Sequence, residues 1–168
     1  MDFTDFKQDR PVFTTSFLTR DCEETFRLAQ MVGQKARPGE VWCLTGTLGA
    51  GKTAFIQGFA KGLGYEGRVT SPTFGLQNIY EARLHLYHFD WYRLGNAAEV
   101  LDLGWEEWLL RGGVVVVEWG DKFSELFPPA TIQMEIEILD ENARRLILSA
   151  SIPESVNRLQ EIVQCWPL

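Results

Sequence analysis

The stretch with the clearest chemical meaning is "GTLGAGKT", residues 46–53, which matches the phosphate-binding pattern G-x-x-x-x-G-K-[ST] in full. Its glycines allow positive φ angles and a close backbone approach, so successive N–H groups can surround an anion at a helix N-terminus. Lys52 is expected to reach the β- and γ-phosphates, and the hydroxyl of Thr53 is expected to bind Mg²⁺. The pattern therefore predicts a site for a nucleoside triphosphate with magnesium.

Two acidic residues that end apolar stretches are candidates for holding the metal and the attacking water. Glu118 closes "VVVVE", and Asp90 closes "LYHFD". A P-loop ATPase needs an acid at the end of a strand that neighbours the loop. We expect one of these carboxylates to hold Mg²⁺, directly or through water, and the other to orient the water. With Lys52, they are the candidate catalytic residues.

The segment "TSPTF" supplies two hydroxyl groups in an extended loop, because Pro72 keeps the residue before it out of helical geometry. Ser71 and Thr73 are placed to sense the γ-phosphate, as switch loops do. The two histidines, His85 and His88, belong to no recognisable ligand or catalytic pattern. We expect both to pack at strand positions.

The elements around these residues follow from hydrophobic periodicity and turn signals. Helices are expected over 20–39, after the glycine-rich loop to Gly64, over 96–111 as one or two pieces, and over 152–166. Strands are expected over 40–46, 74–80, 84–90, 112–118, 131–139 and 144–151, and residues 1–15 are expected to be loose. The prediction is a single α/β P-loop NTPase domain with a largely parallel central sheet, helices on both faces and an antiparallel hairpin.

Length and composition exclude several classes of protein. The 168 residues suggest one domain, and 45% hydrophobic with 23% charged residues is ordinary for a globular chain. No apolar run reaches the ~18 residues of a membrane span, and the N-terminus lacks a signal peptide's apolar core, so a cytoplasmic location without a membrane partner is expected. The net charge of −7 disfavours direct binding to a nucleic-acid backbone.

Five segments in this order, "GTLGAGKT", "SPTF", "YHFDWYRL", "EVLDLGWEEW" and "VVVVEW", resemble the bacterial TsaE (YjeE-type) ATPases. The resemblance implies a role in making threonylcarbamoyladenosine at position 37 of tRNAs that read ANN codons. It also implies partners, TsaB and TsaD, with tRNA held only indirectly through that complex. ATP hydrolysis, slow in the isolated chain and stimulated by the partners, is expected to reset the complex.

The same resemblance implies roles for individual residues. Thr53 and Glu118 would ligate Mg²⁺, with Asp90 close by. Arg144 would pack beside the adenine, and the start of the first helix, from Asp21 to Thr25, would close the other side of the base. The phosphates would be held by Gly49, Ala50, Gly51, Lys52, Thr53 and Ala54.

Other nucleotide-dependent classes are less compatible with the sequence. A small-molecule kinase of the P-loop class is the alternative, but it should carry an arginine-rich lid, and no arginine-dense segment follows the loop. A GTPase should carry N-K-x-D to read guanine, and this run does not occur. A nucleotide-binding scaffold without turnover also remains compatible, since a bound nucleotide does not prove hydrolysis.

Overall fold

The computed structural model describes residues 12–72 and 77–167, so Thr73 and the beginning of the expected strand at Phe74 lie outside the described residues. The strands are β1 (Phe13–Thr19), β2 (Val41–Thr45), β3 (Gln77–Tyr80), β4 (Leu86–Asp90), β5 (Val114–Glu118), β6 (Ile132–Ile138) and β7 (Arg144–Ala150). The helices are α1 (Cys22–Gln34), α2 (Lys52–Gly62), α3 (Ala97–Asp102), α4 (Trp105–Leu109), the 3₁₀ segment η2 (Gly120–Leu126) and α5 (Pro153–Cys165).

The described strands form one sheet in the order β1-β7-β6-β2-β5-β4-β3. The four central strands, β6, β2, β5 and β4, run parallel, whereas β3, β7 and β1 pair antiparallel with their neighbours. The α/β domain, its parallel centre and the β3–β4 hairpin are confirmed. The whole sheet is mixed because antiparallel strands flank the parallel centre: the short β6–β7 connection permits only an antiparallel return, and β1 pairs antiparallel with β7.

Strand β1 begins at Phe13, inside the segment that was expected to be loose. Its exposure alternates along the chain, but the inward positions include Thr15 and Thr19 while Leu18 points outward and is 62% exposed. Hydrophobic alternation is the main sequence signal for a strand, and β1 lacks it, so the sequence pattern did not predict this strand.

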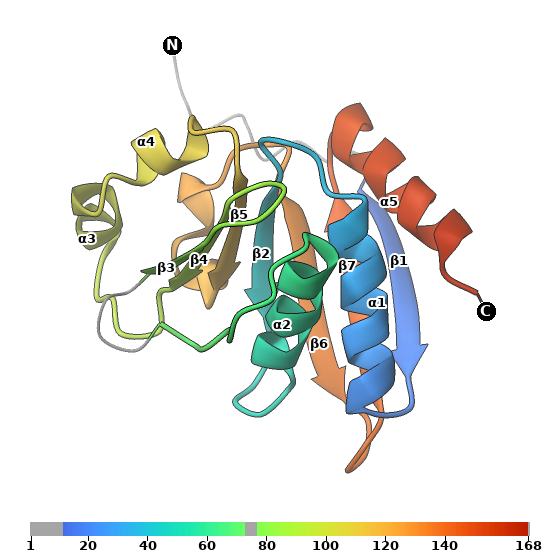
Figure 1. Ribbon diagram of the computed structural model, residues 1–168. Helices are drawn as coiled ribbons and strands as arrows, with labels where there is room; N and C mark the ends of the chain where they lie inside the picture. The colour runs from blue at the N-terminus through green and yellow to red at the C-terminus, as the bar shows by residue number, and fades with distance from the viewer. Residues whose placement is uncertain (1–11, 73–76, 168) are drawn as a thin grey trace.

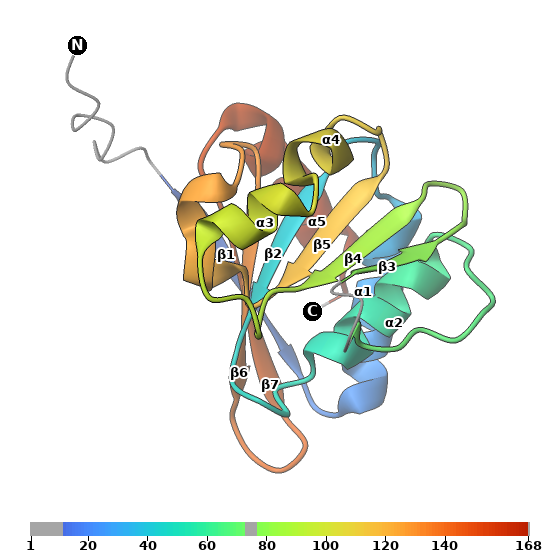
Figure 2. The same ribbon diagram turned by 90° about the vertical axis from the view of Figure 1, so that its left-hand side faces the viewer.

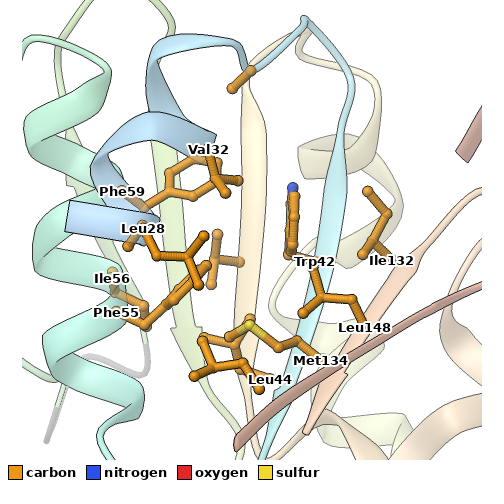
Figure 3. Close-up of a cluster of buried hydrophobic side chains, with 14 of the residues drawn as sticks. Leu28, Val32, Trp42, Leu44, Phe55, Ile56, Phe59, Ile132, Met134 and Leu148 are labelled. Carbon is orange, nitrogen blue, oxygen red and sulfur yellow. The ribbon is translucent and has the colours of Figure 1, made fainter. Parts of the chain in front are cut away.

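Helices cover both faces of the sheet, as Figures 1 and 2 show. Helices α1, α2 and α5 pack on one face, where Phe55, Phe59 and Leu28 surround Trp42 of β2 (Figure 3). Helices α3, α4 and segment η2 cover a second core on the opposite face. Because side chains alternate along a strand, every second residue of β4 and β5 faces α2. No helix among the described residues is long and apolar enough to cross a membrane.

Helices α1 and α2 approach each other closely through three glycines. A Cβ atom added to Gly33 would lie 2.2 Å from the Phe59 carbonyl oxygen. One added to Gly58 would lie 2.4 Å from the Phe26 oxygen, and one added to Gly62 would lie 2.1 Å from the Gln30 oxygen. No real side chain fits at such distances. The glycines therefore set the separation of the two helices.

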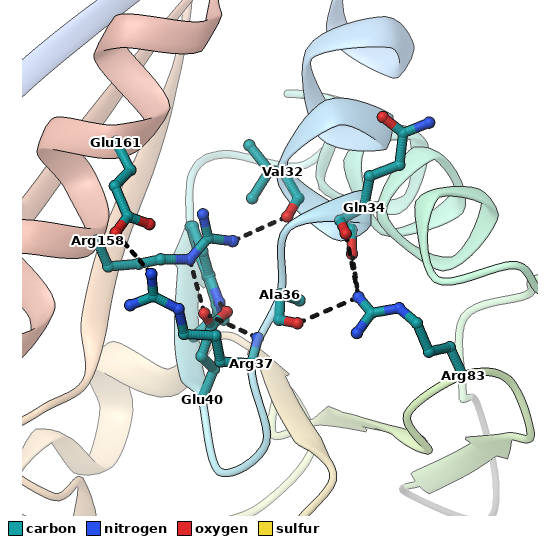
Figure 4. Close-up of polar contacts among 10 residues, drawn as sticks. Val32, Gln34, Ala36, Arg37, Glu40, Arg83, Arg158 and Glu161 are labelled. Carbon is teal, nitrogen blue, oxygen red and sulfur yellow. Dashed lines mark hydrogen bonds and ion pairs between the residues drawn. The ribbon is translucent and has the colours of Figure 1, made fainter.

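Helix α5 is fastened to the body of the domain by a buried ion pair (Figure 4). Arg158 is 2% exposed, and its Nε donates to Glu40 at 2.6 Å while one terminal nitrogen donates to the Val32 carbonyl at 2.8 Å. Glu40 also accepts from the Trp42 indole nitrogen at 3.1 Å. The C-terminal helix is thus tied to the residues that lead into β2.

Candidate functional site

The glycine-rich loop joins the end of β2 to the N-terminus of α2. Gly46, Gly49 and Gly51 have φ angles of 144°, 80° and 109°, a region that disfavours any residue with a Cβ atom. Gly46 is restricted further, because an added Cβ would lie 2.8 Å from the Ile136 oxygen. The loop leads directly into α2, and the first N–H groups of a helix, which have no partner within the helix, can bind an anion.

Lys52 turns inward within this loop and is only 6% exposed. Its Nζ atom donates to the carbonyl oxygens of Gly46 at 2.7 Å and Thr47 at 3.0 Å. It also lies 4.4 Å from the centroid of the Trp119 ring. Burial lowers the pKa of Lys52, although Glu118 and Asp90 oppose this change. Thr53, which follows, is half-buried at the beginning of α2.

The two candidate acids lie side by side at the carboxyl ends of β4 and β5, where Asp90 is the register partner of Glu118. The Asp90 carboxylate accepts from the backbone nitrogen of Tyr92 at 2.9 Å and from the Ser71 hydroxyl at 3.3 Å. Burial raises the pKa of Asp90 above its ordinary value, and the charge of Glu118 adds to the effect. The structure thus brings Ser71, Asp90 and Glu118 together.

Glu118 has a buried partner that sequence analysis missed. His88 is fully buried, and its Nε2 atom lies 2.8 Å from Oε2 of Glu118. The alternation of side chains along a strand could have indicated this partner, because His88 precedes Asp90 by two residues and so faces the same side of the sheet. Two further residues join this region: Trp119, in the left-handed conformation with φ 61°, and Tyr92, whose ring centroid lies 5.0 Å from that of Trp119.

A cavity of about 100 Å³ opens beside the start of α2. Arg144 forms one wall and is fixed by a hydrogen bond from its Nε atom to the Ala50 oxygen at 3.0 Å. Thr25 comes from α1, whereas Asp21 does not line the cavity and instead caps α1 by accepting from the Glu24 nitrogen at 2.8 Å. Cys22 lies in the segment from Asp21 to Thr25 that was expected here, whereas sequence analysis missed Glu141 and Asn142. The lining residues are Cys22, Thr25, Ala50, Gly51, Ala54, Glu141, Asn142 and Arg144.

Comparison with known proteins identifies the family. Residues 19–147 match the family model described as "Threonylcarbamoyl adenosine biosynthesis protein TsaE". The chain belongs to the TsaE family. The matched segment contains the glycine-rich loop, both candidate acids and the arginine of the cavity wall, and it leaves most of β1 and all of α5 outside.

Individual TsaE proteins support this assignment. The tRNA threonylcarbamoyladenosine biosynthesis protein TsaE of Treponema pallidum is 37% identical over 132 residues, which cover 79% of this chain and 98% of the relative. The TsaE protein of Bacillus subtilis is 40% identical over 129 residues, covering 76% and 80% respectively. The crystal structure of Bacillus subtilis YdiB superimposes with a TM-score of 0.78 at 31% identity, covering 93% of this chain and 98% of that one. The family's role is in tRNA threonylcarbamoyladenosine biosynthesis.

Proposed function

We propose that this TsaE-family chain is an ATP hydrolase that binds ATP with Mg²⁺ at the glycine-rich loop and works with TsaB and TsaD to form threonylcarbamoyladenosine in tRNA. The observation that carries the proposal is the juxtaposition of three charged groups. Asp90 and Glu118 end adjacent parallel strands in register, and the Lys52 ammonium of the loop lies 4.4 Å from the ring centroid of Trp119, the residue that follows Glu118. This is the arrangement that phosphoryl transfer requires.

The donor set beside the loop suits magnesium, which prefers oxygen ligands such as carboxylates and hydroxyls. Thr53 and Glu118 would hold the ion, with Asp90 beside Glu118 on the neighbouring strand, and bound Mg²⁺ would neutralise charge on the phosphate oxygens. Lys52 would exchange its bonds to the Gly46 and Thr47 carbonyls for the β- and γ-phosphates.

The proposed reaction is hydrolysis of the terminal phosphate bond. Water attacks the γ-phosphorus, the bond to the bridging oxygen breaks, and ADP and phosphate leave. The acid that is not engaged with the metal orients this water, and Ser71, which already donates to Asp90, joins the site from the extended loop. The reaction needs positioning and charge stabilisation rather than a covalent intermediate.

The cavity beside α2 is a suitable place for the adenine base. The planar guanidinium of Arg144 can stack on an aromatic ring, and its bond to the Ala50 oxygen holds it at the edge of the phosphate loop. Thr25 and Cys22 of α1 would close the opposite side of the base. Adenine should be preferred over guanine, because the chain lacks the guanine-reading N-K-x-D sequence.

The test compares two lysines of the same helix. Lys52→Ala should abolish productive binding of ATP–Mg²⁺, measured by calorimetry and by phosphate release. The matched control is Lys61→Ala, because Lys61 is exposed on α2 and pairs with Glu66 at the surface; it should behave as wild type. Unchanged affinity and turnover in Lys52→Ala would refute the proposed site. Phosphate transfer to an acceptor, in place of release, would indicate a kinase.

The partner part of the proposal needs a second experiment. Phosphate release should be slow for the chain alone and should rise when TsaB and TsaD are added, because a partner surface can order a loop and exclude water. Thr73→Ala, in the segment after Ser71, should reduce the stimulation. Rapid hydrolysis by the isolated chain, or no stimulation, would contradict the coupling. The net charge of −7 supports an arrangement in which the partner proteins, rather than this chain, hold the tRNA.

A further inference from the structure

The buried His88 has a contact pattern that packing alone does not explain. Its side chain is fully buried, Nε2 lies 2.8 Å from Oε2 of Glu118, and Nδ1 has no hydrogen-bond partner among the described residues. Leu86, two residues earlier on the same face of β4, is a fully buried aliphatic residue. A leucine at position 88 would likewise fill space without burying an unpaired nitrogen, which is unfavourable.

We propose that His88 is a positioning residue, which holds the Glu118 carboxylate in the orientation needed to bind Mg²⁺. The inference rests on the proposed function, because it concerns the metal of the same site. An ionised carboxylate only accepts hydrogen bonds, so Nε2 carries the hydrogen and donates to Oε2. One carboxylate oxygen is thereby fixed by the protein, which selects the rotation of the whole group.

The two acids of the site are held by different means, and this explains why Glu118 needs a side-chain partner. Asp90 accepts from the backbone nitrogen of Tyr92 and from Ser71. Among the hydrogen bonds of the described residues, His88 is the donor to the Glu118 carboxylate. Groups that hydrogen-bond to metal ligands orient them, and their loss typically lowers metal affinity or activity by about 10–100-fold.

The position of the donor atom provides the test. Glutamine carries an amide nitrogen the same number of bonds from Cα as Nε2 of histidine, whereas the nitrogen of asparagine corresponds to the unpaired Nδ1. His88→Gln should therefore keep the bond to Glu118, and His88→Asn and His88→Leu should lose it. His85→Leu is the matched control, because His85 is exposed just before β4 and does not pack at a strand position as expected.

The measurement is phosphate release at increasing MgCl₂, together with calorimetric binding of ATP in EDTA and thermal unfolding of each variant. His88→Leu and His88→Asn should need about 10–100-fold more Mg²⁺ or turn over that much more slowly. Affinity for ATP in EDTA should stay at the wild-type value. His88→Gln should recover most of the Mg²⁺ response, and His85→Leu should match wild type.

The outcomes separate this inference from the proposed function. A wild-type chain that neither binds nor hydrolyses ATP would overturn the proposed function itself. An active wild type together with a normal Mg²⁺ response in both His88→Leu and His88→Asn would overturn only the role of His88. The inference is also refuted if His88→Gln and His88→Asn are equally impaired. This last comparison decides the question alone if His88→Leu does not fold.

Discussion

Gly58→Ala should destabilise the domain, although alanine is the better helix former. Gly58 lies inside α2 and faces α1, and an added Cβ would lie 2.4 Å from the Phe26 oxygen and 2.8 Å from Cβ of Ala29. The first contact involves the backbone of α1, so no side chain can turn away to make room. The helices must instead separate by about 0.6 Å before the new methyl reaches even the shortest distance, 3.0 Å, that real contacts show.

Two effects of opposite sign decide how much Gly58→Ala changes the free energy of unfolding. Replacing glycine by alanine inside a helix stabilises it by about 1 kcal/mol. Inserting a methyl group into a closely packed contact typically costs about 1–3 kcal/mol, and a backbone contact belongs at the upper end of that range. The expected net loss in the free energy of unfolding is therefore about 1–2 kcal/mol, which lowers the melting temperature by about 2–8 °C in a domain of this size.

The assay is urea unfolding of the wild type and the variant, with Gly95→Ala as the matched control. Gly95 has no strained φ angle, and the nearest atom to an added Cβ there is a Glu99 side-chain oxygen at 3.5 Å. The control should stay within about 0.5 kcal/mol of wild type. If Gly58→Ala were as stable as wild type or more stable, helix propensity alone would account for the result, and the close contact between α1 and α2 would not set their separation.

Two further predictions concern the edges of the site. The side-chain hydrogen bond from Arg20 lowers the pKa of Glu24 to about 2, so its contribution to stability should be present above pH 4.5 and lost as the pH falls toward 2. The difference in melting temperature between wild type and Glu24→Gln should shrink over that range; a constant difference would contradict the prediction. Tyr80→Phe removes the hydroxyl that hydrogen-bonds to the backbone nitrogen and oxygen of Thr70. The amide hydrogen of Thr70 should therefore exchange faster, by a factor that corresponds to a loss of about 1 kcal/mol in the free energy of local opening. Unchanged exchange would show that Tyr80 does not hold this segment.

The parts of the fold with strong local signals were predictable from the sequence. The loop from Gly46 to Thr53 follows a buried strand and starts a helix, because its pattern specifies backbone, charge and hydroxyl together. The side-by-side placement of Asp90 and Glu118 followed from each residue ending an apolar stretch, since parallel strands bring their carboxyl ends to one edge. Whether these residues bind nucleotide and metal remains a prediction.

The missed features depend on contacts between distant parts of the chain. His88 and Glu118 are 30 residues apart, and only the pairing of β4 with β5 brings them within hydrogen-bond distance. Asn142 reaches the cavity through the β6–β7 turn, which carries no ligand pattern of its own. Such contacts come from tertiary packing, which local periodicity does not encode.

The ion pair between Arg158 and Glu40 shows that the folded domain extends beyond the segment that the family model matches. The matched segment ends at residue 147, in the middle of β7, and it begins at residue 19, where β1 is finished. A chain shortened to those limits would lose the strand that covers the outer edge of β7, and unpaired edges invite association with other chains. It would also leave the Glu40 carboxylate without its cation at the entrance to β2. The limits of the family-model match are therefore unsuitable as boundaries for expressing this domain.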